Sequence, residues 1–349
     1  MKRIFSSKRD SILAKVCIFL VMVALIAAMT SCGGDGDNNL PPSENLEIYD
    51  WYDLDDVRNN LAGNHTLMND MDSNTLGYTE LASPTANGGK GWQPIGSPTP
   101  HGPTAYVDFT GTFNGQGYEI RDLYINRPDE CWSGLFGGTY EASISNISVV
   151  NATVIGDEYV GALLGCNEGI VSNCYCSGKV TGHKDVGGMV GANNHGTVYN
   201  SQFTGSVIGV DNVGGLTGRN NGTVSDSYST GNVTGESYVG GLAGCQSVGI
   251  ISNSYSTSSV TGTSFVGGLV GRNFEGPVIN SFWDIETSGQ THSYHAGTGK
   301  NTTEMQNIAT FSGVGWNIIA VANTTMRDTS YIWNIVNNLT YPFLSWQPV

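Results

Sequence analysis

A segment of 26 or 27 residues is repeated four times along the middle of this chain, and a fifth, partial copy follows. Each copy begins with Val-Gly-Gly-Leu or a close variant, at Val160, Val186, Val213, Val239 and Val266. A constant period of this length is typical of a solenoid, in which each repeat forms one coil and covers the apolar edge of the next. We therefore expect the repeats to stack along one axis.

The residue types of the repeat favour strands over helices. The copies are rich in Val, Ile, Ser, Thr, Tyr and Gly and poor in Leu, Glu, Lys and Ala. A coil of this length accommodates three short strands and three turns. The sequence therefore predicts an all-β fold, a parallel three-sided β-solenoid whose coils lie about 4.8 Å apart.

Alignment of the copies shows which side chains form the core. Two further columns are apolar in every copy; they hold Leu163, Met189, Leu216, Leu242 and Leu269, and Val180, Val207, Val233 and Val260. The Gly pair between the Val and Leu columns predicts a corner, where Gly permits a positive φ or a close backbone approach. A column of amides predicts a side-chain ladder; it holds Asn173, Asn200, Asp226, Asn253 and Asn280.

The repeats divide the chain into parts. We expect 134–284 to form the solenoid, and 45–133 to form an N-terminal cap and the first coils, with a hairpin or first-coil geometry around the Asn-Gly pair at 114–115. We expect 285–349 to form a C-terminal cap, because the end coils of a solenoid expose open edges. This cap should contain a short helix whose N-cap is Thr302 or Thr303, and an aromatic plug of Trp333, Tyr341, Phe343 and Trp346.

The first residues have the pattern of an export signal. A basic start precedes the apolar run 16–28, which is too short for an ordinary membrane span. The following "MTSC" resembles a bacterial lipobox, in which the Cys becomes lipidated, although Met29 stands where Leu is usual. The resemblance implies a signal peptide over 1–31, lipidation of Cys32, a flexible tether over 32–44 and an outer-membrane or cell-surface location. A plain secretory signal and an uncleaved anchor are the alternatives.

Charge limits the partners of the exported part. The chain has a net charge of −15, and five of its 15 basic residues lie in the first 15 positions. A body this acidic does not attract nucleic acid or anionic lipid by charge. We therefore expect no nucleic-acid partner, and membrane attachment through Cys32 alone.

Several motifs in a fixed order resemble the family of bacterial proteins that carry the GLUG motif. They are "DLDDVRNNLAGNHTLMNDMD", "GTFNGQGYEI", the Val-Gly-Gly-Leu repeats, "FWDIETSGQ" and the final aromatic segment, and together they cover about 45–349. The resemblance implies secreted or surface-attached proteins, often adhesin-like. It implies no catalytic residues within the repeats.

Acidic residues precede the Val column in several copies. Asp157, Asp185, Asp211 and Glu236 are expected at one corner of successive coils, where stacked carboxylates repel one another unless a cation bridges them. Calcium is the candidate cofactor because it prefers oxygen ligands. Solvated turn residues with no cation are the alternative.

Aromatic residues also precede the Val column. Tyr159, Tyr238 and Phe265 share one position in their copies. They are expected to form an exposed stripe for a ligand, since aromatic rings stack on sugars or fill partner pockets. Alternatively, they cover a corner of the core.

No motif of a known catalytic site is present. The chain has no Gly-x-Ser-x-Gly, no phosphate-binding loop and no His-Glu-x-x-His. The spacing of the body's cysteines matches no zinc template, and Cys174 and Cys176 are expected to fill Ser-like positions; the others are Cys131, Cys166 and Cys245. We predict a non-catalytic surface lipoprotein that binds an extracellular glycan or protein. A structural envelope spacer and a β-helical polysaccharide lyase or hydrolase are the alternatives.

Overall fold

The computed structural model describes residues 45–96 and 107–347. The chain divides into two units, Met1–Pro41 and Pro42–Val349, and only the second is described here. The expected signal peptide, Cys32 and the tether therefore lie outside the described residues. Within the described part of the chain, no helix is both long enough and apolar enough to cross a membrane.

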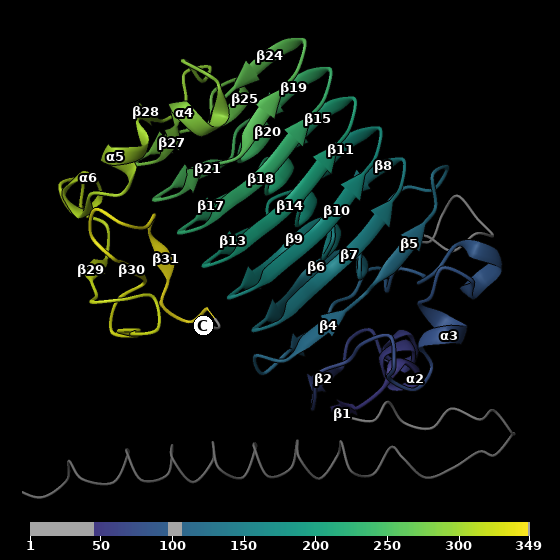
Figure 1. The fold of residues 1–349 in the computed structure, drawn as a ribbon. Helices are drawn as coiled ribbons and strands as arrows, with labels where there is room; N and C mark the ends of the chain where they lie inside the picture. Colours follow the sequence, from purple (N-terminus) through teal and green to yellow (C-terminus); the bar gives the residue numbers. More distant parts are fainter. Residues whose placement is uncertain (1–44, 97–106, 348–349) are drawn as a thin grey trace, which may run out of the picture. The chain divides into compact units, whose positions relative to one another are not determined.

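Three parallel sheets form the sides of a β-solenoid, as predicted (Figure 1). The first sheet contains β1 (Asn45–Ile48), β2 (Asn64–Leu67), β3 (Thr112–Asn114), β6 (Phe136–Ser145), β9 (Leu164–Ser172), β12 (Val190–Asn193), β13 (Thr197–Tyr199), β16 (Thr217–Asn220), β17 (Thr223–Ser225), β20 (Ala243–Gln246), β21 (Ile250–Ser252), β25 (Val270–Asn273) and β26 (Val278–Ile279). The second contains β4 (Glu119–Arg121), β5 (Tyr124–Asn126), β7 (Ser148–Ile155), β10 (Tyr175–Thr181), β14 (Gln202–Ile208), β18 (Tyr228–Thr234), β22 (Tyr255–Ser256), β23 (Ser259–Thr261), β27 (Phe282–Asp284) and β28 (Thr298–Lys300). The third contains β8 (Glu158–Val160), β11 (Lys184–Gly187), β15 (Asp211–Gly214), β19 (Ser237–Gly240) and β24 (Ser264–Gly267).

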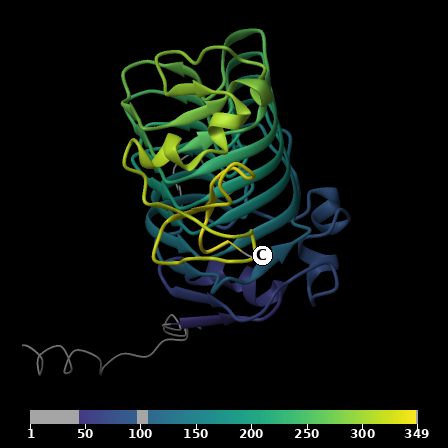
Figure 2. The ribbon, with the colours of Figure 1, turned by 60° about the vertical axis from the view of Figure 1, so that its left-hand side comes forward.

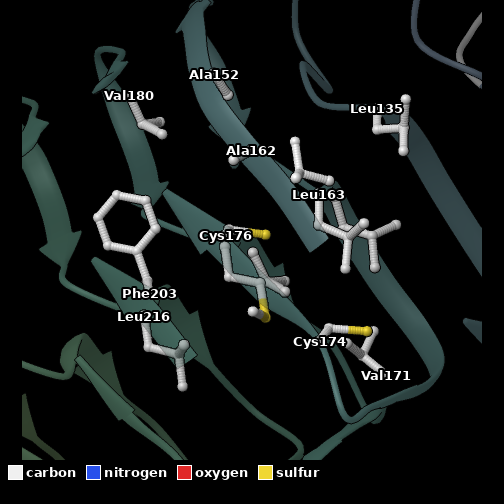
Figure 3. Packing of buried hydrophobic residues seen from close by; sticks show 14 of the residues in the cluster. Leu135, Ala152, Ala162, Leu163, Val171, Cys174, Cys176, Val180, Phe203 and Leu216 are labelled. Atoms are coloured by element: carbon white, nitrogen blue, oxygen red, sulfur yellow. The ribbon is translucent and has the colours of Figure 1, made fainter. Parts of the chain in front are cut away.

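The register of these strands follows the sequence period. Val186 pairs with Val213, Val213 with Val239, and Val239 with Val266, so equivalent residues stack from coil to coil. The Leu column and the second Val column are buried, as expected. Leu163, Val180 and Leu216 extend into the same interior (Figure 3).

The Gly pair at the corner between the third and first sheets allows neighbouring backbone atoms to approach closely. A Cβ added to Gly214 would lie 2.0 Å from the carbonyl oxygen of Thr217 and 2.6 Å from the amide nitrogen of Gly244. Gly214 does not have a positive φ; that conformation occurs instead at the residue before each Val of the first column. Of the two roles expected for the Gly pair, close approach is therefore the observed one.

The N-terminal segment completes the first coils. Strands β3 and β4 pair in parallel with β6 and β7, so the Asn-Gly pair between them lies at a coil corner and not in a hairpin. Helices α2 (Trp51–Asp56) and α3 (Tyr78–Leu81) and the 3-10 turns η1 (Val57–Asn59) and η2 (Ala86–Gly89) lie in the same segment. Trp51 and Trp92 are fully buried, with ring centroids 5.7 Å apart, and close this end of the core.

Short elements follow the last repeat. They are α4 (Ile285–Ser288), α5 (Thr302–Met305), α6 (Ile308–Ser312), β29 (Ile318–Ala320), β30 (Trp333–Ile335) and β31 (Phe343–Leu344). Helix α5 exists where a helix was expected, but its N-cap is Asn301 and not Thr302 or Thr303. The side chain of Asn301 accepts from the amide of Glu304, and the Glu304 carboxylate accepts from the amide of Asn301.

The end of the chain runs back along the flank of the coils instead of covering only their end (Figure 2). We call residues 313–347 the C-terminal strap. The indole nitrogens of Trp316, Trp333 and Trp346 donate to the Asn280 carbonyl (2.8 Å), the Asp226 carboxylate (3.4 Å) and the Asn200 carbonyl (3.0 Å). The expected aromatic plug does form around Trp333, but it packs against the outer face of the second sheet, on Tyr228, Tyr255 and Phe282.

Candidate functional site

One corner of the solenoid carries a column of residues in the left-handed backbone conformation. The column lies directly before the first Val column, and consecutive members belong to consecutive coils. Its φ values are 64° at Trp132, 58° at Tyr159, 52° at Asp185, 53° at Asn212, 53° at Tyr238 and 51° at Phe265. Four of its six members are therefore aromatic.

These aromatic residues are unfavourable choices for that conformation. A positive φ is tolerated by Gly and, to a lesser degree, by Asn and Asp, whereas a bulky side chain there costs of order 1–3 kcal/mol. Another corner follows this rule, because its left-handed column consists of amides and one carboxylate: Asn146, Asn173, Asn200, Asp226, Asn253 and Asn280. The aromatic column therefore uses side chains that the backbone alone does not favour.

The aromatic side chains gather on the surface. The rings of Tyr238 and Phe265 stack with centroids 5.0 Å apart and planes 12° apart, and Tyr294 lies 5.6 Å from Phe265. Phe274, which is 55% exposed, lies 6.5 Å from Tyr238. Trp132 and Tyr159 form a second pair, 6.3 Å apart. Of the three predicted residues, Tyr238 and Phe265 therefore stack, whereas Asp185 and Asn212 separate Tyr159 from them; all three are half-buried.

Two arginines are part of the same surface. The guanidinium carbon of Arg272 lies 4.8 Å from the ring centre of Phe265 and 5.2 Å from that of Phe274. No acidic side chain within the described ranges forms an ion pair with Arg272, and its Nε is buried without a hydrogen-bond partner. Arg219 lies 5.6 Å from the ring of Tyr159. We call the whole set the aromatic–arginine stripe: Trp132, Tyr159, Arg219, Tyr238, Phe265, Arg272, Phe274 and Tyr294.

Asp185 positions the side chain of Arg219. Its side chain is fully buried, accepts a hydrogen bond from Asn212 at 2.7 Å and forms an ion pair with Arg219 at 3.3 Å. Burial raises the pKa of Asp185, and Arg219 opposes that shift. Burial disfavours the charged form of Arg219, but Asp185 raises the pKa of this arginine above its ordinary value. The carboxylate of Asp185 therefore positions a surface arginine and is not open to solvent.

The expected stack of acidic residues does not form. Asp211 pairs with Lys184 and Ser237, so it lies one position away from Asp185, which aligns with Asn212. Asp157 and Glu236 share a third column, but His183 and Val210 separate them. An offset of one residue along a strand changes the direction of the side chain. The four carboxylates thus lie in three columns, and the described residues contain no group of three or more His, Cys, Asp or Glu that could hold a metal ion.

The cysteines of the described unit are free and mostly buried. Cys174 and Cys176 extend into the core (Figure 3). Cys174 fills a Ser position, as expected: its thiol donates to the carbonyl two residues earlier, just as the Ser201 hydroxyl does in the next coil. Burial raises the pKa of the Cys174 and Cys166 thiols to about 12 and that of Cys245 to about 11. These three thiols are therefore protonated near neutral pH.

Sequence reasoning missed the main amide ladder. The side chains of Asn167, Asn193, Asn220 and Gln246 are buried and joined by Nδ2-to-oxygen hydrogen bonds of 2.8, 2.8 and 2.7 Å. The signal was present, since these residues share the seventh position after each Val. Of the predicted column, Asn173 alone belongs to a continuous ladder, and it bonds to Asn146 and through it to Asn114, two residues outside the predicted set. Asp226 also accepts a hydrogen bond from the side chain of Asn253. The other members share the left-handed conformation, which explains their residue type.

No protein-family model matches the chain. Two curated proteins are similar to part of it. Halomucin from Haloquadratum walsbyi is 35% identical over 162 residues, which are 45% of this chain and 2% of Halomucin. A protein of Evansella cellulosilytica named "Putative Gly-rich membrane protein" is 33% identical over 172 residues, which are 46% of this chain and 18% of that protein. The chain thus spans only a small part of both relatives.

A solved structure resembles most of the chain. It is the crystal structure of a "putative immunoglobulin A1 protease" from Bacteroides ovatus, with a TM-score of 0.61, and the match covers 86% of this chain and 92% of that one. The two sequences are 19% identical over the match, so the likeness establishes the shared fold and nothing about activity.

Proposed function

We propose that this protein is a non-catalytic surface module that binds an extracellular glycan or protein through the aromatic–arginine stripe. The observation that carries the proposal is the backbone conformation of the stripe. Tyr159, Tyr238 and Phe265 occupy left-handed positions that Asn would fill at lower cost, and strain of this kind gathers at binding sites.

The chemistry of the stripe indicates what the ligand offers. Stacked, half-exposed rings bind flat apolar faces, such as those of sugars or of aromatic side chains. Arg272 adds a positive charge to a protein of net charge −15. No carboxylate of the described residues forms an ion pair with it. A guanidinium held on aromatic rings favours carboxylate-bearing ligands. We therefore infer that the ligand carries carboxylates beside apolar faces, as acidic glycans and acidic protein segments do.

Surface attachment is the second part of the proposal. We infer export by the N-terminal signal and lipid anchoring through Cys32, at the outer membrane or cell surface. The apolar run before Cys32 and the lipobox-like "MTSC" support this inference. A relative named as a membrane protein is compatible with it. We also infer membership of the GLUG-motif family, on the motifs described above.

The test uses the full chain, solubilised in a polyoxyethylene detergent because sugar-headed detergents would compete. It is applied to arrays of acidic glycans, neutral glycans and extracellular-matrix proteins, and the supernatant is assayed for released sugars. Saturable binding without released sugar is expected. Arg272→Gln should weaken the affinity for the ligand found on the arrays at least tenfold. Arg121→Gln, at an exposed arginine outside the stripe, should leave that affinity unchanged.

The other outcomes favour other functions. Released sugar that disappears in Asp185→Ala or Asp211→Ala would replace the proposal with a polysaccharide lyase or hydrolase. No binding and no product on any array would leave the structural spacer. Binding that is unchanged by Arg272→Gln would exclude the stripe as the contact surface. Labelling of Cys32 by a palmitate analogue in expressing cells, absent in Cys32→Ser, tests the anchor separately.

A further inference from the structure

A polar cleft opens where the C-terminal strap ends on the first coils. It has a volume of about 350 Å³ and is lined by Asn114, Gln116, Gly117, Asn146, Ser148 and Trp346. Trp346 comes from the C-terminal strap and the others from the first coils, and none belongs to the aromatic–arginine stripe. We propose that this cleft binds one residue of a neutral saccharide, with the indole of Trp346 as its platform.

The platform is held rigidly. The indole nitrogen of Trp346 donates to the carbonyl of Asn200 at 3.0 Å, which orients the ring. The rest of the strap is fixed by Trp333 and Tyr255, which lie in the buried aromatic cluster against the second sheet. A ring fixed in this way stacks on a sugar without losing side-chain freedom on binding, which favours affinity.

The amides of the cleft are also oriented, and each retains an available atom. Asn114 Oδ1 accepts from Asn146 Nδ2 at 3.1 Å and from the amide of Gln116 at 3.0 Å, and Gln116 Nε2 donates to the Leu67 carbonyl at 3.0 Å. Among the described residues, Asn114 Nδ2 and Gln116 Oε1 have no hydrogen-bond partner. The lining thus offers one donor and one acceptor, the two kinds of group that sugar hydroxyls need as partners.

The absence of charge in the lining decides the ligand class. All the side chains that line the cleft are neutral, so a charged ligand would lose solvation there without gaining an ionic partner. An aromatic face with a few oriented polar groups is the usual chemistry of small-ligand sites. A neutral sugar offers an apolar ring face and several hydroxyls, and it fits both features.

The experiment measures binding of cellohexaose, mannohexaose and chitohexaose to the full chain in a polyoxyethylene detergent by isothermal titration calorimetry. At least one of them should bind saturably. Gln116→Gly removes the acceptor at a position with a φ of 53°, which Gly tolerates, and should weaken binding at least fivefold. Trp346→Ala should abolish binding, and Trp346→Phe should retain it within about fivefold. His195→Gly, at a φ of 59° and outside the lining, is the matched control.

Three results would overturn the proposal. The first is no binding of any of the three sugars, and the second is binding that survives both Gln116→Gly and Trp346→Ala. The third is binding that is lost in Phe265→Asn, because that result places the sugar on the aromatic–arginine stripe. The last result contradicts the cleft but supports the stripe as a contact surface, with a neutral ligand in place of a carboxylate-bearing one, so the two proposals fail separately. Melting temperatures of all variants identify any that are misfolded.

Discussion

The ring of Tyr238 lies on the ring of Phe265, with centroids 5.0 Å apart, and both residues have the left-handed backbone conformation. Two adjacent coils thus carry an aromatic residue at the same unfavourable backbone position, and the two side chains form one surface. Another left-handed column of the same solenoid consists of Asn residues and one Asp, the residue types that this conformation favours.

The Phe265→Asn variant tests whether the ring of Phe265 binds a ligand or covers the core. Asn is favoured at a φ of 51° and relieves backbone strain, but it removes the stacked ring. We expect the free energy of unfolding to change by less than about 1 kcal/mol, because the two effects oppose each other. Affinity for the ligand should fall at least tenfold. A loss of about 2 kcal/mol or more in urea unfolding, with binding intact, would show that the ring covers the core instead.

The buried amide ladder should be essential for stability. Asn220 accepts from Asn193 and donates to Gln246, and both neighbours are buried. Asn220→Ala leaves polar groups without partners and should lower the free energy of unfolding by about 2–4 kcal/mol. Asn221→Ala, the next residue, breaks a half-buried bond to Asn194 and should cost less than about 1 kcal/mol. Equal effects in chemical denaturation would contradict this role.

Asp226 should make stability depend on pH. Burial raises the pKa of this carboxyl above its ordinary value of 3.8. The folded state therefore binds the proton more tightly than the unfolded state, so ionisation of Asp226 reduces stability as pH rises through its folded pKa. Asp226→Asn keeps an oxygen for Trp333 and matches the rest of its column. We expect this variant to be more stable than the natural protein at pH 7, as measured by urea unfolding.

The pH profile of that difference provides the control. The advantage of Asp226→Asn should shrink as pH falls and should vanish below about 3.8, where the carboxyl is protonated in both states. An advantage that stays constant from pH 7 to pH 3 would show that packing, and not ionisation, causes it.

The close approach at the corner should exclude even one methyl group. Gly214→Ala would place a Cβ 2.0 Å from the Thr217 carbonyl oxygen, with backbone on both sides. We expect a loss of about 3 kcal/mol or more, or failure to fold. Gly117→Ala is the control; its φ is 85°, but no atom lies within 4 Å of the added Cβ. Thermal unfolding of both variants tests this, and a Gly214→Ala protein as stable as the control would refute it.

The sequence was informative wherever coils repeat. The Val and Leu columns identified the core, since the four complete copies bury the same positions. The predicted acidic stack was wrong because Asp185 and Asp211 differ by one position relative to the following Val and therefore belong to different columns. The buried ladder was obscured by Asn pairs, at 193–194 and 220–221, of which only the first member points inward.

Two features could not be predicted from the repeat. Aromatic residues do not signal a left-handed backbone, since that conformation ordinarily favours Gly and Asn. The position of the C-terminal strap depends on contacts such as Trp333 with Asp226, which join residues 107 apart in the sequence. No local pattern encodes such a contact, so the strap was expected at the end of the solenoid and lies along its flank.

The strap changes how the solenoid resists mechanical load. In a simple stack, each coil touches only its neighbours, and a pulling force can peel coils away one at a time. Here three indoles hold Asn280, Asp226 and Asn200, which belong to three different coils. The last coils cannot peel away until the strap detaches from all of them. Under tension, this end of the molecule should therefore unfold as one cooperative unit and not coil by coil.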